Sequence, residues 1–151
     1  MIAAIGVLDV ESVAFAALPL FHVNALVVTL LAPLFKGQRG VWAGPLGYRD
    51  TSLFASFWKV VERYGISFMS GVPTIYGVLA DRPVDADIAS LRFALVGASA
   101  LPKAVRERFE SATGVPLLEG YGLTEATCAS ARSFVEHPVP GTAASVCPTS
   151  R

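Results

Sequence analysis

The chain has 151 residues, of which 53% are hydrophobic and 16% charged, and twelve Lys plus Arg balance twelve Asp plus Glu. This length predicts one domain, and the composition excludes a disordered chain or an acidic tail. The basic residues form no dense cluster, so no electrostatic argument supports nucleic-acid binding, and we expect no nucleic-acid partner.

The first predicted elements lie in residues 12–35, a stretch without a charged residue. Its length would suit a transmembrane helix. However, Pro19 interrupts the stretch, and His22 and Asn24 would lie near the bilayer centre, where polar side chains are costly. We therefore predict a buried strand, a loop and a buried helix, with no transmembrane span. The preceding residues carry two carboxylates and no basic leader, which disfavours a secretory signal and leaves the cytoplasm as the expected location.

A helix is predicted over residues 50–64, where apolar side chains recur at helical spacing. Asp50 or Thr51 would cap its N-terminus, and the glycine that follows the segment would end it. A short apolar run over residues 66–71 then predicts a strand, and a second helix follows over residues 73–80, with proline at its first position.

Residues 92–118 predict a strand-helix-strand crossover: a strand over residues 92–96, a helix over residues 102–113 ended by Gly114, and a strand over residues 115–118. The helix has a predicted buried stripe made of Ala104, Val105, Phe109 and Ala112. Its charged side chains are expected to form a solvated face; these are Lys103, Arg106, Arg108 and Glu110.

The alternation of strand-like and helix-like segments predicts an α/β fold with a mostly parallel sheet and flanking helices over residues 1–135. Residues 136–151 contain three prolines and no apolar periodicity, so we expect an irregular tail. His137 in this tail is interpreted as a solvated residue. Cys128 and Cys147 have no Cys or His neighbours at metal-ligand spacing, which supports neither a zinc site nor a disulfide framework.

Two glycine turns follow strands of this crossover, at residues 97–99 and 120–122, and should open at the same edge of the sheet. The first turn by itself is ordinary packing chemistry. Beside the second, Tyr121 can lie flat against a base while the Thr124 hydroxyl donates to a phosphate and Glu125 coordinates a magnesium ion. Alternatively, Thr124 and Glu125 simply start a helix.

Four segments carry a family resemblance. In order and at similar spacing, they resemble the adenylate-forming enzymes, which include acyl-CoA synthetases, aryl-CoA ligases, luciferases and the adenylation domains of peptide synthetases. The segments are LPLFHVNAL at residues 18–26, SGVPTIYGVLA at 70–80, LRFALVGASALP at 91–102 and EGYGLTEAT at 119–127. The resemblance covers about residues 12–130, and its most specific part is the YGLTE segment.

The resemblance implies a nucleotide site at the second glycine turn. In the family, the tyrosine of this motif stacks on adenine, the threonine binds the α-phosphate and the glutamate holds magnesium. Here these residues are Tyr121, Thr124 and Glu125, and the glycines beside the tyrosine, Gly120 and Gly122, would also contact the nucleotide.

The resemblance also assigns the first turn and a histidine. Gly97, Ala98 and Ser99 match the family's adenine-side loop and would contact the nucleotide and the acyl pocket. His22 matches the family's aromatic-histidine position, beside the carboxylate substrate and the thiol entry route. Without the resemblance, His22 would be interpreted as a half-buried histidine between a strand and a helix.

The reaction that the resemblance implies has two steps. A carboxylate attacks the α-phosphate of ATP, which gives an acyl-adenylate and pyrophosphate, and a thiol such as coenzyme A then displaces AMP. ATP, AMP, magnesium and coenzyme A are therefore the expected cofactors. The small residues near the first turn favour a fatty or aromatic acid as substrate, and the chain length of this acid is left open.

Several parts of the family pattern do not occur in this chain. The phosphate loop that ends in Pro-Lys is missing, no Asp follows Asp87, and Lys36, Lys59 and Lys103 lie outside the matching context. The apolar share is also high for a domain of this size. We therefore expect a middle slice of the large N-terminal domain, with little or no ligase activity alone and a tendency to associate. The tail only half matches the family, and a truncation, or a frameshift near residues 131–143, is a hypothesis for it.

Three functions remain open. The first is an ATP-dependent acid-thiol ligase represented by a fragment. The second is a non-catalytic remnant or nucleotide-binding module of the same fold. A phosphate loop encoded upstream would argue against this second function. The third is a dinucleotide oxidoreductase built on the first glycine turn, which the lack of a three-glycine fingerprint disfavours.

Overall fold

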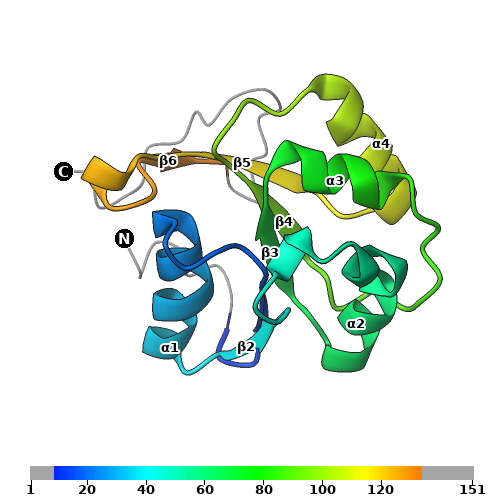
Figure 1. The fold of residues 1–151 in the computed structure, drawn as a ribbon, viewed down its shortest axis with the longest axis horizontal. Coiled ribbons are helices and arrows are strands. Elements are labelled where there is room, and N and C mark those ends of the chain that lie inside the picture. The colour runs from blue at the N-terminus through cyan, green and yellow to red at the C-terminus, as the bar shows by residue number, and fades with distance from the viewer. Residues whose placement is uncertain (1–8, 134–151) are drawn as a thin grey trace.

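The computed structural model describes residues 9–133, which form one six-stranded sheet with helices on both faces (Figure 1). The strand order is β2-β1-β3-β4-β5-β6. Neighbours among the first five strands pair in parallel, and β6 pairs antiparallel with β5. The strands are β1 (Val13–Ala16), β2 (Arg39–Trp42), β3 (Phe68–Gly71), β4 (Phe93–Val96), β5 (Leu117–Tyr121) and β6 (Ala131–Arg132). The predicted α/β class with a mostly parallel sheet is confirmed.

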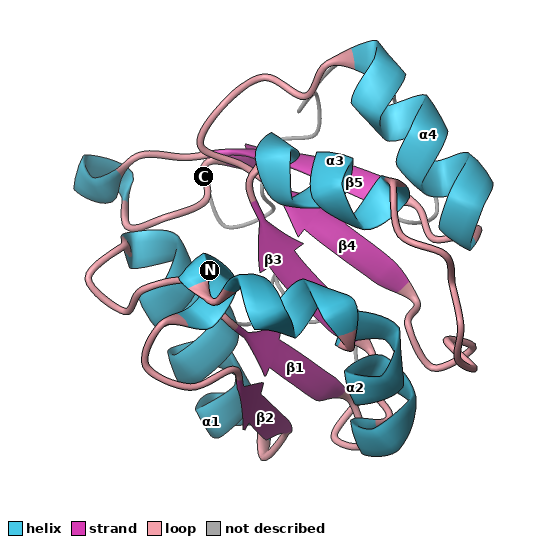
Figure 2. Ribbon diagram, turned by 45° about the vertical axis from the view of Figure 1, so that its right-hand side comes forward, coloured by secondary structure: helices cyan, strands magenta, loops and turns pink. Residues whose placement is uncertain are grey.

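Helices lie against the sheet (Figure 2), and they are of three kinds. The α-helices are α1 (Ala32–Lys36), α2 (Phe57–Tyr64), α3 (Pro73–Ala80) and α4 (Lys103–Thr113). A π-helix spans Ala25–Leu31, and short 3-10 helices span Gly47–Arg49, Thr51–Ala55 and Thr124–Ala126. Within residues 9–133, none of the helices has the length and apolar character needed to cross a bilayer.

Alternate residues along β1, β3, β4 and β5 enter two different hydrophobic clusters, as the two faces of a sheet require. On one face, Phe15 and Met69 pack with residues of α2, α3 and α4, and the rings of Phe15 and Phe57 meet edge to face at 5.4 Å. On the other face, a smaller cluster joins Ala14 of β1 to Val28 of the π-helix. Each large side chain fully buried in these clusters contributes roughly 1.5–3 kcal/mol.

The charge-free stretch forms the predicted strand, loop and helix, but the helix is a π-helix. Within it, the Thr29 hydroxyl donates to the Ala25 carbonyl at 2.7 Å, a side-chain bond to the preceding turn that often accompanies a bend in a helix. The backbone bonds five residues back at the end of the segment, from the Ala32 N–H to the Val27 carbonyl.

The helix predicted over residues 50–64 is divided. A 3-10 helix capped by Asp50 ends at Ser56, where φ is −125° and ψ is 13°, and α2 begins at the next residue. This break directs Phe54 to stack on Tyr48, while Phe57 packs on Phe15. The predicted glycine stop after the segment is confirmed, and the helix over residues 73–80 is also confirmed.

Two strands were not predicted, and both contribute little apolar periodicity. β2 is an edge strand with mostly exposed residues, and β6 has only two residues. The prediction that the strand after Gly114 covers residues 115–118 is wrong at both ends, because β5 spans residues 117–121. Its extension is stabilised by β6, which pairs with Gly120 and Tyr121.

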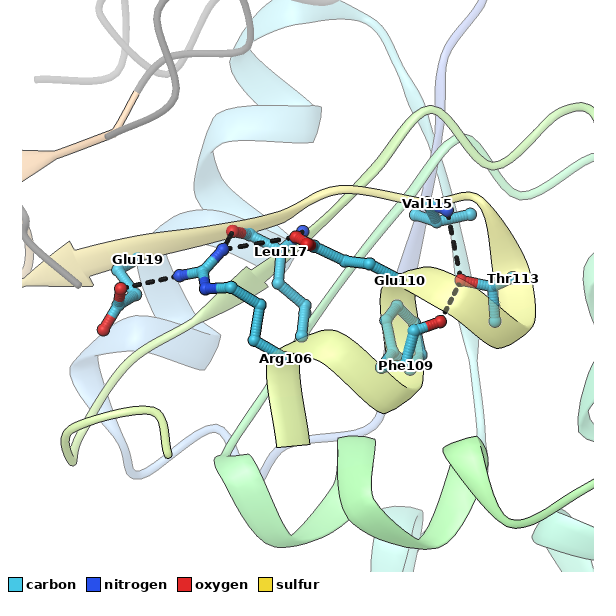
Figure 3. Close-up of polar contacts among 7 residues, drawn as sticks. All are labelled: Arg106, Phe109, Glu110, Thr113, Val115, Leu117 and Glu119. Carbon is cyan, nitrogen blue, oxygen red and sulfur yellow. Dashed lines mark hydrogen bonds and ion pairs between the residues drawn. The ribbon is translucent and has the colours of Figure 1, made fainter. Parts of the chain in front are cut away.

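The prediction for the faces of α4 is partly wrong. Phe109 is fully buried and packs edge to face on Tyr76 of α3, as its place in the stripe predicted. Ala104 and Ala112, however, are exposed. Arg106, expected in water, keeps only 11% of its side chain exposed and binds Glu110 and Glu119 (Figure 3). The helix therefore uses a charged cluster, and not a wider apolar stripe, to contact β5.

The predicted irregular tail over residues 136–151 lies outside the described residues, as do His137, Cys147 and most of the proposed frameshift region.

Candidate functional site

The candidate site lies where β3, β4 and β5 reach their carboxyl ends. Gly71 pairs with Val96 in the sheet register, and Val96 pairs with Glu119. The Gly97 N–H also donates to the Gly71 carbonyl at 3.4 Å. Both glycine turns therefore open at the same sheet edge, as expected for strands joined by one crossover.

Two buried tyrosines hold the ends of these strands. The Tyr48 hydroxyl donates to the Ser70 carbonyl at 3.1 Å, and the Tyr76 hydroxyl donates to the Leu95 carbonyl. Burial raises the pKa of both hydroxyls above the usual value, so both remain protonated donors. The two hydroxyls thus donate hydrogen bonds to backbone carbonyls next to the candidate site, at the carboxyl ends of β3 and β4.

A cavity of about 490 Å³ occupies this edge of the sheet. Its walls come from residues 18–28 after β1 and from the ends of β3, β4 and β5 with the loops that follow them. Most of the predicted site residues line it: His22, Gly97, Ala98, Gly120, Tyr121, Gly122 and Thr124. Ser99 and Glu125 are exposed neighbours of lining residues but do not line the cavity themselves.

The aromatic ring and the hydroxyl of the YGLTE motif are accessible. Tyr121 is 61% exposed at the cavity wall, so one face of its ring is available to a flat ligand. Thr124 is exposed, and it begins the 3-10 helix that also contains Glu125. Among residues 9–133, neither Thr124 nor Glu125 has a side-chain hydrogen-bond partner. Both features considered for this pair are therefore present: a helical turn starts here, and its polar groups are available to a ligand.

His22 lies in the turn between β1 and the π-helix, on the cavity wall. Its ring is exposed and lies 4.6 Å from the Phe21 ring, centroid to centroid. His22 does lie between a strand and a helix, as interpreted, but its ring is exposed and not half-buried. The ring is available to a ligand in the cavity.

Two further polar residues of the cavity were missed as site residues. Asn24 lies just before the π-helix, and Cys128 follows the 3-10 turn. A polar residue within an apolar, charge-free stretch was a usable signal for Asn24. Cys128 had no such signal, because only the return of the chain after Gly122 brings its side chain to the cavity.

Cys128 should react slowly with alkylating reagents. Burial raises the pKa of its thiol from 9.0 to about 11, and the residue is 6% exposed. At pH 8 the thiolate fraction should therefore be about a hundredfold below that of an ordinary cysteine, and it should rise as pH approaches 11. Iodoacetamide labelling of a Cys147→Ser variant, followed by mass spectrometry from pH 7 to 10, measures this rate. Labelling as fast as that of the urea-unfolded variant at pH 8 would contradict the buried placement.

The described residues contain no group of three His, Cys, Asp or Glu side chains that could hold a metal ion by themselves. Glu125 fits a different kind of metal site. Magnesium typically binds one or two carboxylates together with phosphate oxygens of the substrate and several waters. A single exposed carboxylate beside Thr124 has the donor chemistry for that arrangement.

The fold and the cavity define a parallel α/β domain with a ligand site at the carboxyl ends of its strands, the place where such sheets bind nucleotides. The chain belongs to the AMP-binding enzyme family, whose model matches residues 2–149.

The comparisons with individual proteins agree. The chain is 43% identical over 130 residues to marinolic acid–CoA ligase of Pseudoalteromonas. The matched region covers 84% of the chain and 20% of that protein. It is 35% identical over 131 residues to a long-chain-fatty-acid–CoA ligase of Thermus thermophilus. Here the matched region covers 85% of the chain and 23% of that protein. Thus the chain spans about a fifth of these relatives. Its fold matches a crystal structure of an anthranilate CoA ligase in complex with anthranoyl-AMP at a TM-score of 0.79 and 23% identity, covering 94% of the chain and 28% of that structure.

Proposed function

We propose that this chain forms the adenine-side part of the active site of an ATP-dependent acid-thiol ligase. That ligase would join a carboxylate to AMP with release of pyrophosphate, and would then transfer the acyl group to a thiol such as coenzyme A with release of AMP. The observation that carries the proposal is that His22, the turn beginning at Gly97 and the motif at residues 120–124 all line one cavity. Family membership and relatives named as CoA ligases support it.

Each residue then has a distinct role. The Tyr121 ring would stack on adenine, and the Thr124 hydroxyl would donate to the α-phosphate, where negative charge increases as the carboxylate attacks. His22 would lie beside the reacting carboxylate. Gly97, Ala98 and Ser99 would border the nucleotide and the acyl group. The protein would act by orienting these groups and by donating hydrogen bonds, without a covalent nucleophile.

The remaining cofactors and the location are also part of the proposal. Glu125 would hold magnesium, which when bound would neutralise charge on the phosphates. The acid would be fatty or aromatic; the relatives named above carry marinolic acid and long-chain fatty acid in their names. The enzyme would work in the cytoplasm.

We expect the purified 151-residue chain to bind AMP but not to form acyl-adenylate. Isothermal titration calorimetry measures the first point, and Tyr121→Ala should weaken AMP binding by about fivefold to a hundredfold through lost stacking. Tyr64→Ala is the matched control, because Tyr64 is a 44% exposed tyrosine of α2 that does not line the cavity. Equal AMP affinity in the Tyr121 variant and the wild type would contradict the assigned stacking. Pyrophosphate release by the chain alone, with ATP and a carboxylic acid, would contradict its expected inactivity.

The non-catalytic alternative, already considered from the sequence, is a nucleotide-binding module of the same fold. Sequencing the parent gene on both sides of codons 1 and 151 separates the two. A phosphate loop upstream, together with the family's Asp, hinge and Lys downstream, supports the ligase. Stop codons on both sides support the module.

A further inference from the structure

A partly buried hydrogen bond joins β3 to the segment that precedes the π-helix. The Ser70 hydroxyl donates to the Oδ1 atom of Asn24 at 2.9 Å, across 46 residues of sequence. Ser70 is only 2% exposed, so its hydroxyl would be costly to bury without this partner. The Ser70 backbone is also held, because its carbonyl accepts from the Tyr48 hydroxyl.

In the structure the Asn24 amide is oriented with its oxygen toward Ser70. With Oδ1 accepting from Ser70, the Nδ2 group remains as a donor, and no described residue accepts from it. Gly97 leaves space beside this group, since a Cβ atom at position 97 would lie 3.7 Å from Nδ2. Asn24 and Gly97 both line the cavity, so a ligand there can reach the amide donor.

Asn24 lies on the apolar, inner side of the cavity. The side chains of Val28 and Cys128, also in its wall, are 5% and 6% exposed, whereas Tyr121 is 61% exposed. A charged nucleotide is better accommodated beside the exposed groups, and the apolar inner wall suits the organic part of an acid. The Nδ2 donor therefore faces the place where the acid's own substituents would lie.

We propose that Asn24, oriented by Ser70, selects carboxylic acids that carry a second hydrogen-bond-accepting oxygen, such as a ketone or hydroxyl, over plain alkanoic acids. The proposal rests on the ligase function proposed above and narrows its substrate class. An apolar chain would leave the amide donor desolvated without a partner, and a site built around such a donor discriminates against ligands that lack the acceptor.

The test uses the full chain and non-hydrolysable acyl-sulfamoyl adenosines. One carries a hexanoyl group, and the others carry oxo-hexanoyl groups with the ketone at successive carbons. We expect at least one oxo analogue to bind about fivefold to tenfold more tightly than the hexanoyl analogue, as one hydrogen bond provides. Asn24→Leu should remove this preference.

Two further variants make the result specific. Asn24→Asp keeps an acceptor for Ser70 but replaces the Nδ2 donor with an oxygen, so it should also lose the preference for the ketone. Ser90→Ala is the control, because the Ser90 hydroxyl donates to the Ile66 carbonyl away from the cavity, and it should keep the preference. Circular dichroism checks that each variant is folded.

The outcomes separate this proposal from the function on which it rests. AMP binding without any preference for an oxo analogue, or a preference that persists in folded Asn24→Leu, overturns the substrate selection alone. A loss of AMP affinity in Asn24→Leu also overturns it, because Asn24 would then contact the nucleotide. Failure of the wild-type chain to bind both AMP and every analogue overturns the proposed function, and this selection with it.

Discussion

Replacing Gly122 with alanine should abolish most AMP binding while the rest of the sheet stays folded. A Cβ atom at this position would lie 1.4 Å from the carbonyl oxygen of Cys128, so the backbone of the returning loop must move. The loop has little freedom to adjust, because Thr127 and Cys128 already have φ angles of 56° and 90°. The displaced segment carries Thr124 and borders Tyr121, so we expect AMP affinity to fall about tenfold or more.

The matched control for this variant is Gly77→Ala. Gly77 lies in α3, and a Cβ atom there would meet nothing within 4 Å. Alanine is favoured over glycine inside a helix by about 1 kcal/mol, so this variant should unfold at a slightly higher temperature and bind AMP normally. Calorimetry gives the affinities, and circular dichroism follows thermal unfolding. Normal AMP binding by Gly122→Ala would show that the close approach of residues 122 and 128 is not part of the nucleotide site.

Local pattern was enough to predict the elements that form one crossover. The strand and helix over residues 92–113 have compact apolar runs between glycine and proline signals, and such signals act within a few residues of sequence. The structure places this strand as β4 and this helix as α4, with shifts of one residue at their starts. The edge strand β2 gave no comparable signal, because its residues are mostly exposed and their pairing is decided by β1.

Tertiary contacts decided the features that sequence reasoning missed. The break at Ser56 separates two phenylalanines that pack on different aromatic partners. The helical spacing of apolar residues does not predict such a break. The motif at residues 119–127 predicted much of the candidate cavity because its residues are close in sequence. Asn24 could not be assigned in the same way, since its partner Ser70 lies 46 residues away.

Loss of the Arg106 guanidinium should destabilise the chain more than loss of any other charge on α4. Arg106 binds Glu119 at 2.6 Å and Glu110 at 3.2 Å, with 11% of the Arg106 side chain exposed (Figure 3). It also donates to the Leu117 carbonyl, while Glu110 accepts from the Leu117 N–H at 2.8 Å. The two side chains thus satisfy a backbone unit of β5 beyond the reach of β6, whose pairing involves residues 120 and 121.

Arg106→Met should therefore lower the free energy of unfolding by about 3–5 kcal/mol, since it removes the cation from beside two carboxylates and the side-chain donor from the Leu117 carbonyl at a mostly buried place. Arg108→Met is the control, because Arg108 pairs with Asp81 on a surface where the two side chains are 51% and 69% exposed. Such pairs contribute about 1 kcal/mol or less. Urea unfolding followed by fluorescence measures both values, and Glu119→Gln, made alone and together with each arginine variant, completes a double-mutant cycle. Equal losses in the two arginine variants would show that the charged cluster contributes no more than a surface pair, and apolar packing, chiefly of Phe109, would then be what holds α4 to the sheet.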